Sequence, residues 1–293
     1  MRRLLPIALL AVLCVPAPAH AWGSEAHHVI MDRAIDLLPP EIQPLFARFR
    51  AVVVERAVDP DTWRTAGFET EDPNHYLDID VPEYGPYPFS ALPRDWDSAV
   101  TKFGVVKLRS NGLVPWRTEE MWGNLRRAFE AYPTRPFGRG DILNFAAWMA
   151  HYASDAHQPF HGVANYNGQL SGQTGVHARF EATLFERYRD RLRIAPKAIA
   201  PVTSPRDFIF DAILADTRLV PTLLAADKAA IGDRDVYDDA YFEAFYGGAH
   251  EIMEQRLNDS IAAVAALITG AWEAAGKPPV PVDPVVTPER RRR

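Results

Sequence analysis

The sequence of 293 residues is poor in cysteine and in strand patterns. Its one cysteine, Cys14, lies in an apolar run near the start of the chain, so disulfide bonds cannot stabilise the rest of the protein. The alternation of apolar and polar residues that predicts strands is nearly absent. The fold must therefore be held by its apolar core or by a bound metal.

A basic surface is also lacking. The chain has 32 basic and 38 acidic residues and a formal charge of −6, which argues against proteins that bind nucleic acid mainly by releasing counterions. With 47% apolar and 24% charged residues, collagenous, disordered and multi-pass membrane proteins are excluded. A polyanion could bind this chain only where another group supplies positive charge.

No apolar run is long enough for a stable membrane anchor. Arg2 and Arg3 precede the apolar stretch from Leu4 to Val15, which is well short of the roughly 20 residues that span a bilayer. The small residues of Ala19-His20-Ala21 then predict a cleavage site. We expect residues 1–21 to be a signal peptide, and the mature protein to begin at Trp22 and to be periplasmic or secreted.

The other end of the chain is rich in proline and then in arginine. Residues 277–293 include four consecutive arginines at the end and no periodic apolar positions. This composition predicts an extended, mobile tail. A tether to an anionic surface is the alternative interpretation.

Between these ends the apolar residues recur at helical spacing, as in the long run from Ala240 to Trp272. Clusters of proline and glycine interrupt the pattern at residues 82–93, 133–140, 165–175 and 195–205. The sequence therefore predicts a single all-α, multi-helix domain over residues 22–276, with seven or eight helices of ordinary length. Residues 82–93 are expected to be a loop or a short irregular insertion.

Histidines and carboxylates in the middle of the chain repeat a four-residue offset. His151 and Asp155 form one such pair, and His177 and Glu181 form another. On a helix each pair shares one face, and a proline after the first pair allows His161 to return toward it. One pair alone is usually a surface ion pair. Two pairs with a further histidine, in a chain without cysteine ligands, predict a site for a divalent metal such as zinc.

This pattern resembles the zinc-dependent phospholipase C and S1/P1 nuclease superfamily over most of the chain after the signal peptide. The hallmark of the family is a His, an Asp four residues later and then Gln-Pro-x-His. Here these are His151, Asp155 and Gln158-Pro159-Phe160-His161. After a loop the family has His-x-x-x-Asp or His-x-x-x-Glu, which matches His177 and Glu181.

The resemblance extends to the start of the mature chain. Members of the family begin with a tryptophan whose free amine and carbonyl bind zinc, and a histidine follows five residues later. An Asp and a His about 14 residues apart come next. The matching residues are Trp22, His27, Asp61 and His75. We prefer them to the neighbours His28 and Asp59. His157 is expected in the core or beside the site, and His250 at the surface.

The resemblance implies three zinc ions. The first would be held by Asp61, His75, His151 and Asp155, the second by the Trp22 amine and carbonyl, His27 and a bridging Asp155, and the third by His161, His177 and Glu181. The implied activity is phosphodiester hydrolysis, in which a metal-activated hydroxide attacks phosphorus. The positive charge of the ions would offset the acidity of the chain, and Asp61 could orient the nucleophile or take its proton.

The resemblance does not decide between a phospholipid and a nucleic acid as the substrate, because some residues match the phospholipases and others match the nucleases. A glutamate at position 181, rather than an aspartate, resembles the phospholipases. Glu25 also matches them, because in those enzymes an acid three residues after the tryptophan contacts choline. A phospholipase C-like hydrolase is therefore the first expectation. Choline recognition also needs aromatic faces, and the corresponding positions here are Thr62 and Asp72.

The alternative is a nuclease that cleaves single-stranded DNA or RNA. Arg64, three residues after Asp61, resembles the nuclease arginine that binds phosphate, and Tyr76 could stack on a base or belong to the core. A third possibility is a zinc-binding export protein without turnover, which predicts no open coordination position. We expect the protein to be a monomer.

Overall fold

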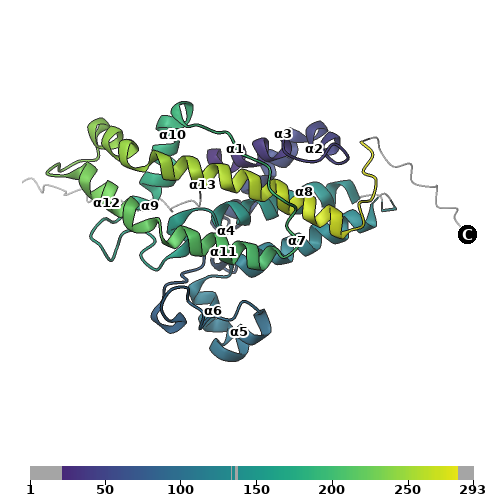
Figure 1. The fold of residues 1–293 in the computed structure, drawn as a ribbon, viewed down its shortest axis with the longest axis horizontal. Helices are drawn as coiled ribbons and strands as arrows, with labels where there is room; N and C mark the ends of the chain where they lie inside the picture. Colours follow the sequence, from purple (N-terminus) through teal and green to yellow (C-terminus); the bar gives the residue numbers. More distant parts are fainter. Residues whose placement is uncertain (1–21, 133, 136–137, 283–293) are drawn as a thin grey trace, which may run out of the picture.

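The structure is a computed structural model, and it describes residues 22–132, 134–135 and 138–282. The predicted signal peptide and residues 283–293 of the predicted tail lie outside this range. Within the described residues every regular element is a helix (Figure 1), so the predicted all-α class is confirmed.

The α-helices differ widely in length. In chain order they are α1 (Ser24–Ile35), α2 (Gln43–Arg48), α3 (Arg50–Glu55), α4 (Asp59–Thr65), α5 (Trp96–Phe103), α6 (Val105–Asn111), α7 (Val114–Ala131), α8 (Gly138–Asp155), α9 (Val176–Ala178), α10 (Phe185–Tyr188), α11 (Pro205–Thr217), α12 (Val220–Ile231) and α13 (Asp239–Ala274). Those with eight or more residues in the described chain are α1, α5, α7, α8, α11, α12 and α13, in line with the seven or eight expected. The short helices were not predicted.

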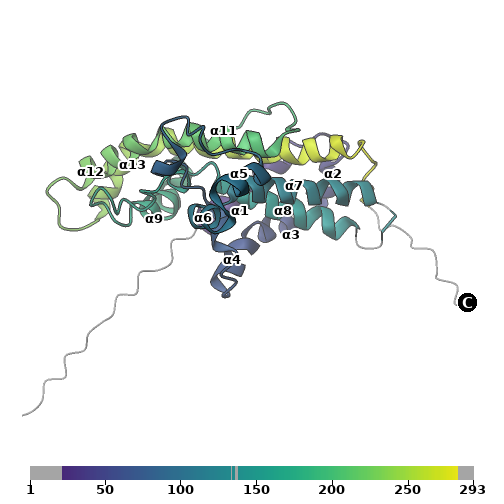
Figure 2. The ribbon, with the colours of Figure 1, turned by 90° about the horizontal axis from the view of Figure 1, so that it is seen from below.

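Tighter and wider turns complete the helical structure. The 3₁₀ turns are η1 (Arg56–Val58), η2 (Asp72–His75), η3 (Pro82–Tyr84), η4 (Pro159–Gly162) and η6 (Arg189–Arg191), and η5 (Arg179–Leu184) is a π-helical turn. The region around η3 is irregular up to α5, as predicted for residues 82–93. Figure 1 shows α5 and α6 below the long helices, and Figure 2 shows α4 projecting from a different side of the bundle.

The long helix α13 organises the bundle. It has 36 residues, which corresponds to a length of about 54 Å, and it runs along the long axis of the molecule (Figure 1). The side chain of Asp238 caps its start by accepting a hydrogen bond from the backbone N–H of Tyr241 at 2.8 Å. Because α13 packs against α1, α7, α8 and α12, it is apolar on more than one face.

Helix α8 carries polar residues into this core. It packs against α7, α13 and α1, and its last turns, including His151 and Asp155, are fully buried. Polar groups at such depth cost free energy unless they find partners. The bundle therefore places a set of buried ligand-type side chains at the carboxyl end of α8.

The first residues of the predicted tail lie against the bundle. Trp272 Nε1 donates a hydrogen bond to the carbonyl of Pro278 at 2.9 Å, and the Tyr132 hydroxyl donates one to Pro281 at 2.6 Å. Val280 is buried. Residues 277–282 are thus anchored, where the sequence predicted a mobile segment, because their carbonyls and one apolar side chain find partners on α7 and α13.

Among the described residues no helix combines the length and the hydropathy needed to cross a membrane.

Candidate metal centre

Three groups of buried histidines and carboxylates each bring potential ligand atoms within 4.8 Å of one another. Every side chain that the sequence predicted as a ligand belongs to one of them. The groups are His27/His151/Asp155, Asp61/His75/His151 and His161/His177/Glu181. Each group could hold a metal ion.

These ligands come from segments far apart in the chain. α1 supplies His27, α4 supplies Asp61, η2 supplies His75, α8 supplies His151 and Asp155, η4 supplies His161, α9 supplies His177 and η5 supplies Glu181. The packing of α1, η1 and η2 onto α8 brings the first five together. The centre is therefore a product of the tertiary fold.

Four side chains converge on one point beside α8. Nδ1 of His75 lies 3.0 Å from Nε2 of His151, and these atoms lie 3.8 and 3.9 Å from Oδ1 of Asp61. Oδ2 of Asp155 lies 2.9 Å from the His75 atom and 3.3 Å from the His151 atom. Ligands about 2.1 Å from a tetrahedral ion are about 3.4 Å apart, so the four residues suit a single ion.

Asp155 faces two groups at once. While its Oδ2 points to His75 and His151, its Oδ1 lies 3.4 Å from Nε2 of His27. This is the arrangement of a bridging carboxylate. The rings of His27 and His151 stack with their centroids 4.1 Å apart, so His151 joins the second group as well as the first, which the sequence did not indicate.

The third group lies at the start of the helical segment that follows the loop. Nε2 of His177 lies 3.1 Å from Nε2 of His161 and 2.7 Å from Oε2 of Glu181. His161 Nε2 is 3.7 Å from the same oxygen. Gln158 Nε2 donates a hydrogen bond to Glu181 Oε2 at 2.7 Å, which fixes the carboxylate. The wider turn of the π-helix η5 carries Glu181, in keeping with the frequent use of such turns at functional sites.

Backbone carbonyls orient two of the imidazoles. Nδ1 of His151 lies 2.8 Å from the carbonyl of Ala57, and Nδ1 of His161 lies 2.8 Å from that of His75. A carbonyl only accepts, so Nδ1 carries the proton in both rings. When the ring is neutral, the Nε2 lone pair is thereby directed at its group, as in metal-binding histidines generally.

A backbone clamp positions His75 and His161 relative to each other. The N–H of Leu77 donates to the carbonyl of His161 at 2.9 Å, and the N–H of Val114 donates to that of Tyr76 at 3.2 Å. Gly112 makes the close approach possible: its φ is +101°, and a Cβ there would lie 2.1 Å from the Tyr76 oxygen. A side chain at this position would push the segment that follows His75 away.

Several buried atoms of these groups lack a hydrogen-bond partner within the described chain. Unpartnered atoms are His27 Nδ1 and Nε2, Asp61 Oδ1 and Oδ2, His75 Nε2, Asp155 Oδ1, His177 Nδ1 and Glu181 Oε1. An unsatisfied buried polar group costs about 1–3 kcal/mol, and native proteins rarely retain several in one place. Open nitrogen and carboxylate atoms fit divalent metal ions, but two of them, His75 Nε2 and His177 Nδ1, belong to rings whose other nitrogen faces the ligand group.

The carboxylates and imidazoles of the groups shift one another's pKa values. Although burial opposes protonation, Asp155 and Asp61 raise the pKa of His151. The same balance holds for His161. Burial lowers its pKa, but Glu181 and Asp155 outweigh burial and raise it. For Glu181, burial favours the neutral form, but the two imidazoles beside it lower the pKa to about 2. Burial lowers the pKa of His27 and His75, so these two rings favour the neutral form that binds metal.

The buried indole of Trp22 lies beside the centre. Its Nε1 donates a hydrogen bond at 2.9 Å to the carbonyl of Ser154, the residue that precedes Asp155. Gly23 packs tightly against η5, where an added Cβ would meet a side-chain carbon at 3.2 Å. The indole thus sits between α8 and η5, which both carry ligands. Coordination by the amine requires removal of the predicted signal peptide and stays a prediction.

The predicted substrate-binding residues are placed differently. Nη2 of Arg64 lies 3.3 Å from Oδ1 of Asp61, and the guanidinium is partly exposed. Tyr76 is half-buried next to a ligand. Glu25 is exposed and lies 3.1 Å from Nη1 of Arg189, so its carboxylate already has a partner.

The remaining histidines and the neighbouring acid lie outside the groups. His157 donates a hydrogen bond to a backbone carbonyl at 2.7 Å, and burial lowers its pKa to about 4, so it is a neutral core histidine. His28 is partly exposed, 4.0 Å from a glutamate. Asp59 accepts a hydrogen bond from a tryptophan indole at 2.9 Å. His250, expected at the surface, is half-buried.

Sequence reasoning missed a buried polar chain behind His75. Oε1 of Glu71 lies 3.9 Å from Nε2 of His75. The Tyr152 hydroxyl donates a hydrogen bond to Glu71 and accepts one from Nη2 of Arg117 at 3.2 Å. Glu71 and His75 share the four-residue offset that revealed the other pairs, so this contact could have been found.

Comparison with known proteins leaves the family open, since no protein-family model matches the sequence and no curated protein matches it. The geometry of the centre is therefore the basis for any functional proposal.

Proposed function

We propose that the protein is a phosphodiester hydrolase that depends on three zinc ions and is of the phospholipase C and S1/P1 nuclease type. The supporting observation is the convergence of three buried groups with unpartnered nitrogen and oxygen atoms. Imidazole and carboxylate ligands suit zinc. Ligands that come from many elements are typical of catalytic sites, because structural zinc sites are usually compact and rich in cysteine.

Bound zinc would lower the pKa of a water molecule and polarise the phosphoryl oxygens of the substrate. The surrounding residues would bind and orient the substrate. The Arg64 guanidinium would hydrogen-bond a non-bridging phosphoryl oxygen. Asp61, which is ion-paired with Arg64 but accepts no hydrogen bond, would accept a hydrogen bond from the attacking water and align it with phosphorus. The buried setting would strengthen these charge interactions by excluding bulk water.

Two contacts favour single-stranded nucleic acid over a choline lipid as the substrate. Glu25, the expected choline contact, is exposed and paired with Arg189. Arg64, which is ion-paired with Asp61 and Asp72, would meet a phosphate beside the ligand group, and Tyr76, which follows the ligand His75, would stack on a base. A phospholipase C-like activity remains the second candidate, on the strength of Glu181 as the acid of the third group.

The decisive experiment uses the exported, processed protein. We expect about three zinc ions per chain by elemental analysis and hydrolysis of bis-p-nitrophenyl phosphate that a chelator abolishes and zinc restores. Parallel assays with single-stranded DNA and phosphatidylcholine vesicles identify the substrate by its product. Hydrolysis that is indifferent to the chelator would overturn the proposal.

A further inference from the structure

The outer nitrogen of His75 faces a carboxylate. Nδ1 of this ring points to the first ligand group, 3.0 Å from Nε2 of His151. Nε2 is buried, has no hydrogen-bond partner in the described chain and lies 3.9 Å from Oε1 of Glu71. In His151 and His161 a backbone carbonyl accepts the hydrogen bond of the outer nitrogen. Glu71 therefore stands where those two ligands have a carbonyl.

Use of Nδ1 as a ligand atom fixes where the His75 ring carries its proton. A metal-binding imidazole is neutral and has one N–H group. With Nδ1 directed at an ion, that proton is on Nε2 and is directed at Glu71. At 3.9 Å the N–H group and the carboxylate attract each other electrostatically, and a shift of about 1 Å would bring them to hydrogen-bond distance.

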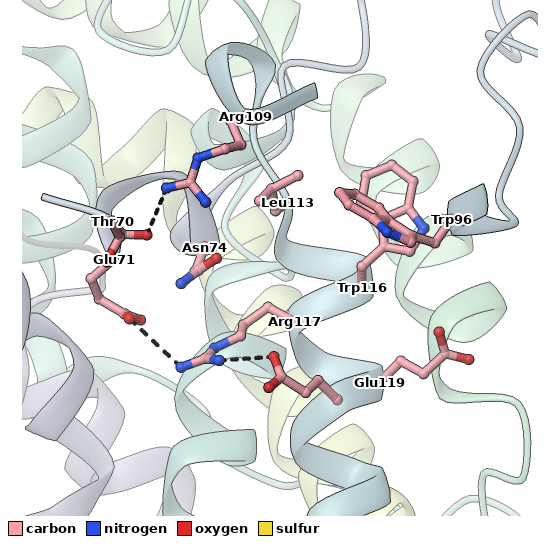
Figure 3. A pocket seen from close by; sticks show the side chains of 10 residues that line it. Thr70, Glu71, Asn74, Trp96, Arg109, Leu113, Trp116, Arg117 and Glu119 are labelled. Carbon is pink, nitrogen blue, oxygen red and sulfur yellow. Dashed lines mark hydrogen bonds and ion pairs between the residues drawn. The ribbon is translucent and has the colours of Figure 1, made fainter. Parts of the chain in front are cut away.

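Two side chains from neighbouring helices hold the Glu71 carboxylate. The Tyr152 hydroxyl, on α8, donates a hydrogen bond to Oε1, and Nη2 of Arg117, on α7, lies 3.6 Å from Oε2. Figure 3 shows Arg117 reaching Glu71 at the wall of a cavity of about 680 Å³. The guanidinium compensates the charge of the buried carboxylate, so Glu71 is fixed before any ion binds.

Tyr152 also connects this carboxylate to the ligand rings. Its ring centroid lies 5.7 Å from that of His75 and 5.4 Å from that of His151, with edge-to-face geometry at both. On the other side, the Glu71 carbonyl accepts a hydrogen bond at 2.9 Å from the N–H of Asn74, in the turn that carries His75. The position of Glu71 is thus coupled to that of the ligand.

We propose that Glu71 is a positioning residue for the first metal ion, whose carboxylate receives the Nε2–H group of His75 and directs Nδ1 at the ion, while Tyr152 and Arg117 hold it in place. A carboxylate behind a metal-bound imidazole fixes the ring and raises its basicity. The inference rests on the proposed function, because it needs a zinc ion at the first group, but it concerns retention of that ion and not the reaction.

The test is retention of zinc by the exported, processed protein in competition with a chromophoric chelator. We expect Glu71→Gln to lose the first ion about 10–100-fold more readily than the parent, because the amide attracts the His75 N–H group less strongly. Tyr152→Phe, which removes the hydroxyl that orients Glu71, should weaken retention by a smaller factor. Both variants should keep the third ion as the parent does.

Glu120→Gln is the matched control. Glu120 also pairs with Arg117, at 2.8 Å, but it is exposed and no described metal ligand contacts it. This variant should hold all three ions as the parent does. A purely structural effect of Glu71→Gln would release the third ion together with the first, so selective loss of the first ion identifies a positioning role.

Parent-like retention of the first ion in both Glu71→Gln and Tyr152→Phe would overturn the inference, and so would equal loss of the first and third ions. Tyr152→Phe keeps the ring and supplies the test if Glu71→Gln does not fold, which circular dichroism shows. Failure of the proposed function gives a different result. In that case the parent holds its ions without hydrolysing phosphodiesters, while Glu71→Gln still loses the first ion selectively.

Discussion

Two buried carboxylates, Asp227 and Asp155, show how differently this bundle treats interior charge. Asp227 accepts hydrogen bonds from Nη2 of Arg179 at 2.9 Å, from Nε2 of Gln173 at 2.7 Å and from the Tyr241 hydroxyl. Both of its oxygens are satisfied by donors of the chain. We call these four residues the Asp227 cluster.

Asp155 has no guanidinium near it in the described structure. Its neighbours are imidazoles, its Oδ1 has no hydrogen-bond partner, and the carboxylates of the adjacent groups also have unpartnered atoms. A buried charge is tolerated when it is paired and hydrogen-bonded. The Asp227 cluster meets this condition with donors of the chain alone, whereas the ligand groups leave buried atoms open that a bound cation could satisfy.

Replacing each carboxylate by an amide should give the largest difference between the two regions in metal content, activity and stability. Asp155→Asn should lose at least two of the three ions, because the carboxylate faces two groups, and should reduce phosphodiester hydrolysis about 10³-fold or more. Asp227→Asn should keep its metal and activity but lose about 3–5 kcal/mol of unfolding free energy, since Arg179 is left buried without its partner. Elemental analysis, turnover and urea unfolding give the three readouts. Equal metal loss in both variants would remove the distinction.

Two glutamines, one in each region, test the same difference between the metal centre and the Asp227 cluster. Gln158 Nε2 donates to Glu181 and Gln173 Nε2 donates to Asp227, both at 2.7 Å. Gln158→Leu should weaken retention of the third ion about 10–100-fold, because a residue that orients a ligand is lost. Gln173→Leu should leave metal affinity unchanged and cost about 1–3 kcal/mol of stability. Competition with a chromophoric chelator measures the first effect. An unchanged third ion in Gln158→Leu would show that Glu181 needs no such support.

The contrast also explains what the sequence could predict. The offset of four residues places His151 with Asp155, and His177 with Glu181, on single helical faces, because helix geometry is local. The all-α class follows from the same periodicity. The start of α13 at Asp239 is equally local, since its cap lies in the adjoining residue.

Other features depend on which segments meet, and no spacing rule contains that information. The placement of His151 in two groups requires α1 to pack on α8. The link from Leu77 to His161 requires an extended segment to lie beside η4. The anchoring of residues 277–282 also depends on a distant partner, Tyr132. Tertiary packing decided each of these.

Acidification should empty the metal centre while leaving the Asp227 cluster intact. Carboxylates raise the pKa of His151 and His161 above the ordinary imidazole value, although burial opposes this. Below those raised values protons compete with metal at both nitrogens, so affinity should fall about tenfold per pH unit for each imidazole that is protonated.

Protonation of Glu181 and Asp155 does not cause that release. The pKa of Glu181 is about 2 and that of Asp155 is well below its ordinary value, because the neighbouring imidazoles outweigh burial; both stay ionised in mild acid. The partners of Asp227 are a guanidinium, a phenol and an amide, none of which gains a proton there. Dialysis from about pH 8 to about pH 5, followed by elemental analysis and circular dichroism, should show metal loss with helices retained. Metal held until the carboxylates titrate would mean that the imidazoles do not control the ions.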